Sequence, residues 1–370
     1  MKYYIVAGER SGDLHGGNLI REIQKLDSKA QIRCWGGDSM KEAGGVLVKH
    51  YRDLAFMGFY EVLKNLLTIR GFLKFCQADI LKFQPDAVIL IDYAGFNLRI
   101  ARFAKENGFR VYYYIAPKTW AWNAARTHKL RKYTDRVFSI LSFELTFFEK
   151  YGVNVTYVGN PLKDAIRSFE PDTSFRENHQ ISREPIIALL PGSRKQEIQN
   201  VLNTLLEVVP HFPKAQFVVA AVGNLPPSYY DSVCSHSQIR IVTDETYQVL
   251  SVANFAIVTS GTATLETALF GVPQVVVYRT STISYRIARA LIRVPYISLV
   301  NLIMDAEVVP ELIQQDFSVE NVVAWSKKLL KDTKERENQL QAYASLQEVV
   351  GDRPTSRIVA EEIINDLLPN

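Results

Sequence analysis

The sequence has little of what would mark a disulfide-stabilised or membrane-spanning protein. Its 370 residues contain three cysteines, Cys34, Cys76 and Cys234, whose spacing suggests neither a disulfide framework nor a zinc site. No apolar run approaches the roughly 20 residues that a spanning helix needs, and the run Tyr3–Ala7 is too short for a signal peptide. A reducing compartment therefore fits, and any membrane association is expected to be peripheral.

Signatures of several other chemistries are also missing. The six histidines form no HxxxH or HxH pair, and no DxD motif marks a divalent-ion nucleotide site, so neither a metal nor another cofactor is expected. Ser11 and Ser260 lie outside any GxSxG motif, which makes hydrolase chemistry a poor reading. The net charge of +4 is mild and the basic residues are spread along the chain, which argues against nucleic-acid binding.

Short apolar runs alternate with helix-length segments, which is typical of parallel sheets covered on both faces. The expected strands in the first half are Tyr3–Val6, Ala87–Ile91, Val111–Ile115 and Val137–Leu141. The pattern restarts after the polar stretch Arg167–Pro185, with Ile186–Leu190, Phe217–Ala221, Ile239–Val242, Phe255–Val258 and Gln274–Tyr278. The fold class is therefore α/β, with two doubly wound domains at 1–166 and 167–345 and a C-terminal helical segment at 346–370 that is expected to cross back to the first domain.

Open α/β sheets bind ligands outside the carboxyl ends of their strands, and the motifs follow strands. The first strand runs into Gly8, Glu9, Arg10, Ser11, Gly12 and Asp13, which combine close backbone approach with polar groups at a helix start. The glycine spacing is not that of a dinucleotide motif, and a plain tight turn with an N-cap is the competing reading.

Asp92 ends the buried strand pattern Ala87–Ile91 and is followed by Tyr93 and Asn97. A carboxylate at this edge of a sheet faces the ligand region. Asp92 is therefore the candidate base for taking a proton from an acceptor hydroxyl, since apolar surroundings raise a carboxylate's basicity. The alternative is an aspartate that merely caps the next helix.

Two loops in the second half suit a diphosphate. Gly192, Ser193 and Arg194 follow one strand and precede a helix, so backbone amides, a helix dipole and a guanidinium come together. Ser260, Gly261, Thr262, Ala263 and Thr264 repeat the arrangement, and Glu266, one turn later, is placed to accept hydrogen bonds from ribose hydroxyls. Each loop alone also reads as an ordinary strand-to-helix turn.

Each of two aromatic segments is compatible with two interpretations. The stretch Phe56–Phe83 is apolar around most of a helix with Lys64, Arg70 and Lys74 interleaved, which fits either a membrane-surface contact or a core helix with extended basic side chains. Trp120 and Trp122 would either stack on a sugar or pack in a core.

With these residues in view, the chain closely resembles the lipid-A-disaccharide synthases, inverting and metal-independent glycosyltransferases of the two-domain GT-B fold. The resemblance rests on motifs that occur in order between Ala7 and Asn301: AGERSGDLHG, LAFMGFYEVL, IDYAGFN, APKTWAW, YVGNPL, LLPGSR, SGTATLE, VVVYR and YISLVN. Their joint occurrence is far more specific than any one of them.

The resemblance implies that UDP-2,3-diacylglucosamine donates its sugar to the 6-hydroxyl of 2,3-diacylglucosamine 1-phosphate, giving a β-1,6 disaccharide and UDP. It also implies an acceptor-binding first domain, a UDP-sugar-binding second domain, and a cytoplasmic enzyme associated peripherally with the inner membrane. Asp92 matches the family's proposed catalytic carboxylate, Glu9 and Ser11 its first-loop residues, and Arg194 a basic residue important for activity. Asn301 matches a polar residue of the second domain, and Ser260–Glu266 match the UDP-binding loop. Glu9 and Arg194 are therefore expected to act with Asp92 in catalysis. The residues expected to bind substrate are Gly8, Ser11, Gly12, Asp13, Asn97 and Asn301.

Two positions depart from the family pattern: Asn160 stands where histidine is usual, and Val300 where proline is usual. They put the role of the loop at Asn160 and the rigidity of the loop at Asn301 in question. A GT-B transferase or epimerase acting on non-acylated UDP-N-acetylhexosamine, and a catalytically idle lipid-sensing scaffold, remain as alternatives. The sequence leaves a homodimer open.

Overall fold

The protein is described from a computed structural model, which describes residues 1–54, 66–122, 125–182, 185–223, 225–230, 237–282, 285, 286, 289 and 294–368. The chain divides into two compact units, Met1–Asp164 with Gly351–Asn370, and Ala165–Val350. Sequence composition placed the divisions after residues 166 and 345. The second differs because one continuous helix runs to Val350.

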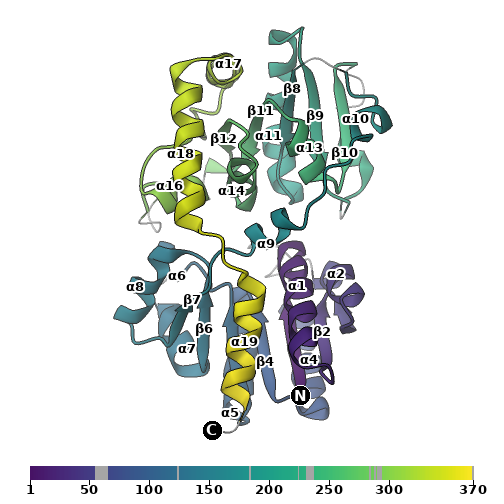
Figure 1. Ribbon diagram of the computed structural model, residues 1–370, viewed down its shortest axis with the longest axis vertical. Helices are drawn as coiled ribbons and strands as arrows, with labels where there is room; N and C mark the ends of the chain where they lie inside the picture. The colour runs from purple at the N-terminus through teal and green to yellow at the C-terminus, as the bar shows by residue number, and fades with distance from the viewer. Residues whose placement is uncertain are drawn as a thin grey trace. The chain divides into compact units, whose positions relative to one another are not determined.

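The first unit is built on a seven-stranded parallel sheet of order β3-β2-β1-β4-β5-β6-β7 (Figure 1). Its strands are β1 (Lys2–Ala7), β2 (Gln31–Gly36), β3 (Val46–His50), β4 (Ala87–Ile91), β5 (Arg110–Tyr114), β6 (Arg136–Ser139) and β7 (Val155–Tyr157). Its helices are α1 (Arg10–Leu26), α2 (Asp38–Glu42), η1 (Tyr51–Leu54), α4 (Leu66–Phe83), α5 (Ala94–Glu106), α6 (Thr119–Trp122), α7 (Ala125–Tyr133), α8 (Ser142–Lys150) and α19 (Thr355–Leu367).

Alternate side chains of these strands enter two cores, because successive residues of a strand point to opposite faces of the sheet. On one face Ile5, Ile89 and Tyr112 pack with residues of α1 and α19. On the other face Val88 and Val111 pack with residues of α4, α5 and α7. The C-terminal helix α19 thus returns to the first unit and lies beside α1 (Figure 1).

The second unit repeats this plan on a six-stranded parallel sheet of order β10-β9-β8-β11-β12-β13. Its strands are β8 (Ile186–Leu190), β9 (Gln216–Ala221), β10 (Ile239–Thr243), β11 (Phe255–Thr259), β12 (Gln274–Tyr278) and β13 (Glu311–Ile313). Its helices are α10 (Phe175–Asn178), α11 (Lys195–Val208), η2 (Val209–His211), η3 (Pro227–Tyr230), α13 (Thr246–Val252), α14 (Thr262–Leu269), α16 (Leu299–Met304), α17 (Val319–Leu329) and α18 (Lys334–Val350). Helix α9 (Leu162–Arg167) spans the first division between the units.

The nine strands expected from the sequence are confirmed, with shifts at their ends. Two end earlier than predicted: β5 stops at Tyr114, because Ile115 turns into the left-handed region, and β6 stops at Ser139. Four strands were not predicted, namely β2, β3, β7 and β13. Strands β3, β7 and β13 are sheet edges or short pieces that are not buried on both faces, and β2 carries Arg33 among its apolar residues, so none has a continuous apolar run.

Helix α4 is fixed to the sheet by a buried polar cluster. The Asp79 carboxylate accepts hydrogen bonds from the Tyr4 hydroxyl at 2.8 Å and from Arg33 Nε and Nη2 at 3.1 and 2.7 Å. The Tyr4 hydroxyl in turn accepts from Trp35 Nε1 at 2.9 Å. Asp79 is 9% exposed, so its charge is held by partners from β1 and β2 instead of water.

Replacing Asp79 with alanine is expected to lower the free energy of unfolding by about 2–4 kcal/mol, since it leaves Arg33 and Tyr4 without their acceptor. Urea denaturation followed by circular dichroism measures the change. The control is Glu106→Ala, which removes an exposed ion pair with Arg102 and should cost at most about 0.5 kcal/mol. Equal losses in the two variants would contradict this account of α4.

Candidate functional site

The carboxyl edge of the first sheet gathers the residues expected at the catalytic site. Parallel pairing places Ala7 opposite Ile91 and Ile91 opposite Tyr114, so Gly8, Asp92 and Ile115 follow neighbouring strand ends. The Asp92 amide continues the ladder by donating to the Tyr114 carbonyl at 3.2 Å. The side chain of Asp92 is half-buried at this edge.

The backbone at this edge is strained. Asp92 and Tyr93 have φ values of 45° and 47°, and Ile115, at the end of the adjacent strand, has a φ of 62°. Residues with a Cβ rarely adopt this left-handed conformation, and it is least favourable for a β-branched residue such as isoleucine. Such strain persists only where the surroundings enforce it, and it clusters at functional sites.

Asn97 and Tyr113 enforce the turn at Asp92. The Asn97 side-chain amide donates to the carbonyls of Val6, Ile91 and Asp92 at 3.3, 3.1 and 2.9 Å. The Tyr113 hydroxyl donates to the same Asp92 carbonyl at 2.6 Å. The Asp92 carbonyl therefore has two side-chain donors from two different elements, which fixes the peptide that carries the carboxylate.

Tyr93, and not Asp92, occupies the N-cap position of α5, and the Tyr93 side chain makes no capping hydrogen bond. Asn97 was expected to contact substrate, but it is fully buried and its amide is directed at three backbone carbonyls. Asn97 thus shapes the Asp92 turn, and its contact with substrate stays a prediction.

The loop after β1 lies against this turn. A Cβ on Gly8 would come within 2.3 Å of the Tyr93 ring, so only glycine allows the two loops to pack as they do. Glu9 is the N-cap residue of α1. Burial, followed by the negative charge of Glu9, raises the pKa of Tyr93. Glu9 is half-buried and Ser11 is exposed, so both remain accessible at the strand edge.

Two other residues of this motif are structural. Asp13, expected to bind substrate, is 3% exposed, and its carboxylate accepts from the backbone amides of Gly37, Ser39 and Met40 at 2.6–3.1 Å. It therefore holds the start of α2. Gly12, also expected to bind substrate, is buried, and a Cβ there would lie 3.1 Å from that of Ala7. Both residues lie on the side of α1 that faces the protein interior, and their assignment to substrate binding stays a prediction.

Sequence reasoning missed Glu144 near the neighbouring strand end. This carboxylate of α8 is 1% exposed and accepts from Trp120 Nε1 at 2.8 Å and from the Ser139 hydroxyl at 2.6 Å. Burial raises its pKa to about 7. Trp120, for which stacking and core packing were both considered, thus has its indole N–H bonded to Glu144 and an edge contact with Phe143. Glu144 belongs to no motif that would have identified it from the sequence.

The two loops of the second unit lie side by side, because β8 and β11 are paired with Leu190 opposite Val258. After β8, Gly192 has a φ of 108°, and a Cβ there would meet the Glu197 carboxylate at 2.5 Å. Glu197 Oε2 accepts from the amides of Ser193 and Arg194 at 3.1 and 3.3 Å. The amides expected to bind phosphate are therefore directed at a carboxylate of the same helix, α11.

Arg194 is exposed and its guanidinium lies 3.3 Å from Glu197 Oε1. An exposed ion pair of this kind contributes little stability, so it constrains the arginine weakly. The start of α11 thus has the groups that bind an anion, namely the amides of Ser193 and Arg194 and the Arg194 guanidinium. In this structure Glu197 engages them.

The loop after β11 is tied to the segment that precedes α16. The Ser260 hydroxyl donates to the Ile297 carbonyl at 2.9 Å, and Thr264 Oγ1 donates to Gly261 and accepts from the Leu299 amide at 3.3 Å. Thr264 is fully buried, and its contact with UDP stays a prediction. Ser260, Gly261, Thr262, Ala263 and Glu266 are exposed or half-exposed.

Asn301 organises the other side of that connection. Its amide donates to Val309 and to Glu311, and its oxygen accepts from the amides of Val308 and Val309, all at 2.8–2.9 Å. Asn301 is fully buried and bonded within the protein, and its assignment to substrate binding stays a prediction. The loop is nonetheless held firmly although Val300 replaces the usual proline, because Glu311 also accepts from the amides of Ile297 and Ser298.

Asn160, the other departure, is a local turn residue. It is 3% exposed, and its side-chain oxygen accepts from the Leu162 amide at 3.1 Å, at the start of α9. An asparagine satisfies this role through an ordinary Asx turn.

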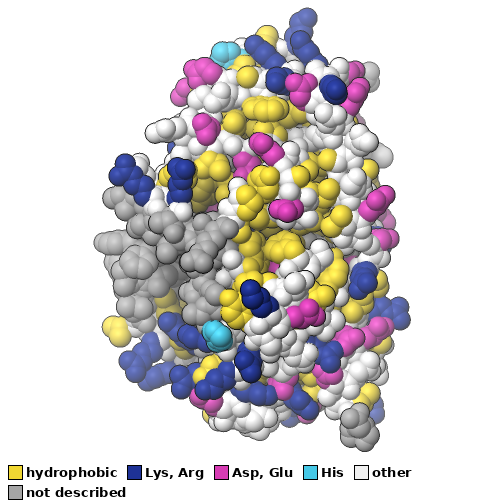
Figure 2. Space-filling view, turned by 90° about the vertical axis from the view of Figure 1, so that its left-hand side faces the viewer, with side chains coloured by type: hydrophobic (Ala, Val, Ile, Leu, Met, Phe, Trp, Pro, Cys, Tyr) yellow, Lys and Arg dark blue, Asp and Glu magenta, His cyan; other side chains and the backbone are white. Residues whose placement is uncertain are grey.

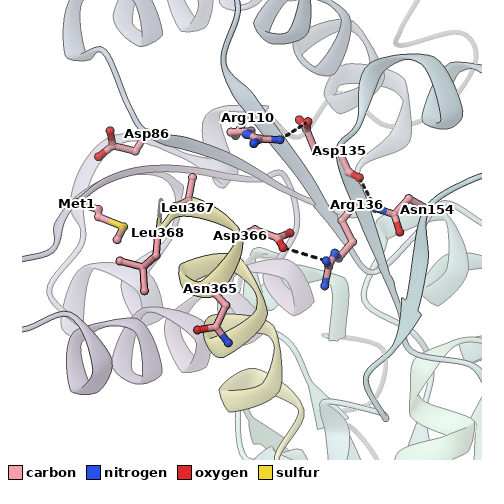
Figure 3. A pocket seen from close by; sticks show the side chains of 10 residues that line it. All are labelled: Met1, Asp86, Arg110, Asp135, Arg136, Asn154, Asn365, Asp366, Leu367 and Leu368. Carbon is pink, nitrogen blue, oxygen red and sulfur yellow. Dashed lines mark hydrogen bonds and ion pairs between the residues drawn. The ribbon is translucent and has the colours of Figure 1, made fainter. Parts of the chain in front are cut away.

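A pocket of about 720 Å³ opens at the opposite, amino-terminal edge of the first sheet (Figure 3). The charged groups around it are paired: Arg136 with Glu362 and Asp366, and Arg110 with Asp135. Ligands of open α/β sheets bind at the carboxyl ends of strands, so this pocket is not the candidate site.

Comparison with known proteins agrees with this geometry. The sequence matches the lipid-A-disaccharide synthetase family over residues 3–360. It is 35% identical to the lipid-A-disaccharide synthase of Geobacter sulfurreducens, over 98% of this chain and 96% of that protein. The enzyme of the same name from Syntrophus aciditrophicus is 38% identical over 86% of each chain.

Solved structures are similar in fold at low identity. The UDP-GlcNAc 2-epimerase of Neisseria meningitidis, bound to UDP-GlcNAc, has a TM-score of 0.70 at 14% identity over 99% of this chain and 100% of that one. The glycotransferase of kitacinnamycin has a TM-score of 0.65 at 14% identity over 100% and 99%. These likenesses show the GT-B fold that the sequence predicted. The match to the family model over nearly the whole chain, with 35% identity to a curated member, shows that the chain belongs to the lipid-A-disaccharide synthetase family of glycosyltransferases.

Proposed function

We propose that the chain transfers 2,3-diacylglucosamine from UDP-2,3-diacylglucosamine to the 6-hydroxyl of 2,3-diacylglucosamine 1-phosphate, with inversion at the anomeric carbon. The products are the β-1,6 disaccharide and UDP. The observation that carries this proposal is the Asp92 carboxylate, held at the carboxyl edge of β4 by a strained turn with donors from Asn97 and Tyr113. Backbone strain of this kind clusters at functional sites, which supports a catalytic role for Asp92.

The reaction needs one base and one stabilised leaving group. Asp92 takes the proton of the acceptor 6-hydroxyl as its oxygen bonds to the anomeric carbon of the donor. The bond from that carbon to the β-phosphate oxygen breaks, and the electron pair leaves with UDP. Glu9, Gly8 and Ser11, at the neighbouring strand end, line the acceptor side in this proposal.

The second unit holds the donor. The Ser260–Ala263 turn at the start of α14 supplies amides and hydroxyls for the diphosphate, and Glu266 accepts from the ribose. At α11 the diphosphate competes with Glu197 for the amides of Ser193 and Arg194, and Arg194 turns from Glu197 to the phosphates. A guanidinium and two helix N-termini then carry the charge of the leaving group without a metal ion.

The acylated substrates place the enzyme at a membrane surface, which we propose is the cytoplasmic face of the inner membrane. Within the part of the chain that the structure describes, no helix is long and apolar enough to span a bilayer. Of the stretch Phe56–Phe83, residues 56–65 lie outside the described residues. The rest is α4, which buries Cys76 and Ile80 but exposes Leu67 (84%), Phe75 (50%) and Leu81 (42%).

Two helices in the same layer as α4, namely α5 and α7, are basic. Helix α7 carries Arg126, Lys129, Arg131 and Lys132 and no acidic residue, whereas α19, on the other face of the sheet, carries Glu361, Glu362 and Asp366. Lys and Arg side chains gather in the lower part of the face shown in Figure 2, on the first unit. Exposed apolar side chains among basic ones suit the headgroup region of an anionic leaflet.

Replacing Leu67 and Leu81 together with serine is expected to weaken vesicle binding about 5- to 20-fold, because two apolar side chains no longer enter the lipid. Co-sedimentation with phosphatidylethanolamine–phosphatidylglycerol vesicles measures binding. The control is Leu26→Ser, an exposed leucine at the end of α1, which should leave binding unchanged. Equal binding by all three proteins would refute membrane contact through α4.

The reaction itself is tested by offering the purified protein both acylated precursors and analysing the products by mass spectrometry. We expect a disaccharide monophosphate together with UDP. Parallel reactions replace the donor with UDP-N-acetylglucosamine and should give no disaccharide. Turnover of the non-acylated donor alone, by transfer or epimerisation, would overturn the proposal in favour of that alternative.

A further inference from the structure

The Glu266 carboxylate, which the proposed donor site assigns to the ribose, is itself held by a side chain that no motif identified. The Tyr247 hydroxyl donates to Glu266 Oε1 at 2.9 Å. Tyr247 belongs to α13, the helix between β10 and β11, whereas Glu266 lies one turn into α14. The bond therefore joins two helices that start at the carboxyl edge of the same sheet.

The ring of Tyr247 is fixed by two other aromatic rings. It packs against Phe270 at 5.1 Å between centroids and edge-on against Phe169 at 5.8 Å, and these two phenylalanines contact each other at 5.5 Å. Phe270 follows the last turn of α14, and its amide donates to the Glu266 carbonyl at 3.0 Å. Geometries of this kind add to the stability of an aromatic cluster, so the hydroxyl is presented from a rigid base.

The segment that carries Phe169 is also docked on α13. Gln248, next to Tyr247, accepts from the Asp172 amide at 2.9 Å and donates to the Glu170 carbonyl at 3.1 Å. The cluster of Phe169, Tyr247 and Phe270 is thus tied by side-chain and main-chain contacts to three segments of the second unit. The Tyr247 hydroxyl is the polar group through which this cluster contacts Glu266.

We propose that Tyr247 is a positioning residue that orients the Glu266 carboxylate toward the ribose diol and so makes the site selective for ribonucleotides over deoxyribonucleotides. The inference rests on the proposed function, because it takes Glu266 as the acceptor of ribose hydroxyls. A glutamate has three side-chain torsions, and an oriented carboxylate discriminates a hydroxyl from a hydrogen better than a mobile one. Tyr247 supplies that order without touching the nucleotide.

The test compares the affinities for UDP, 2′-deoxy-UDP and 3′-deoxy-UDP by titration calorimetry. Tyr247→Phe keeps the ring cluster but removes the hydroxyl, so affinity for UDP should fall about 3- to 10-fold. Affinity for at least one deoxynucleotide should fall much less, so that the ratio of the UDP affinity to the deoxynucleotide affinity decreases. A general loss of packing would weaken all three ligands alike, and that result, or an unchanged preference, would overturn the inference.

Two further variants separate this inference from the proposed function. Tyr230→Phe removes another buried hydroxyl of the second unit, which contacts the Val222 amide, and should leave the preference unchanged. Glu266→Ala should weaken UDP binding and abolish the preference in both the wild-type and the Tyr247→Phe background. If Glu266→Ala leaves UDP binding intact, the proposed donor site is wrong; if it weakens binding while Tyr247→Phe does not, only the role of Tyr247 is wrong.

Discussion

The first unit depends on one side-chain amide. Asn97 bonds to carbonyls at the ends of β1 and β4 and to Asp92 itself, and so it fixes the direction in which the chain leaves the central strands. Two consecutive non-glycine residues are held in the left-handed region by this clamp and by Tyr113. Because the amide is fully buried, its bonds do not compete with water. The Asp92 carboxylate therefore has a defined position before any substrate binds.

In the second unit, too, a buried asparagine side chain fixes the backbone near the proposed site. Asn301 and Glu311 hold the segment before α16, and that segment bonds to Ser260 and Thr264 of the donor loop. Buried polar side chains thus shape the loops at the carboxyl edges of both sheets. Glu9, Arg194 and Glu266, to which the proposed function assigns the ligands, are exposed or half-exposed. Under that proposal, burial separates the polar motif residues that position the loops from those that contact substrate.

Much of this organisation was predictable from the sequence. Continuous apolar runs such as Ala87–Ile91 identified the central strands, and the residue after each run identified the site edge. The roles of Asp13, Asn97, Thr264 and Asn301 were not predictable, because a polar residue in a motif reads the same whether it points to ligand or to backbone. The bonds of Glu144 to Trp120 and of Tyr247 to Glu266 depend on neighbours brought close only by folding. Glu197, by contrast, lies within four residues of the amides it accepts from, as in a local capping interaction.

The central claim, that the clamped Asp92 carboxylate is the base, is tested most directly by the turnover number of Asp92→Asn. Asparagine tolerates the left-handed conformation as aspartate does, so the turn should be kept while the basic group is lost. The account predicts that kcat falls about 10²- to 10⁴-fold while the affinity for UDP is unchanged. An undiminished kcat in a folded, UDP-binding variant would contradict it.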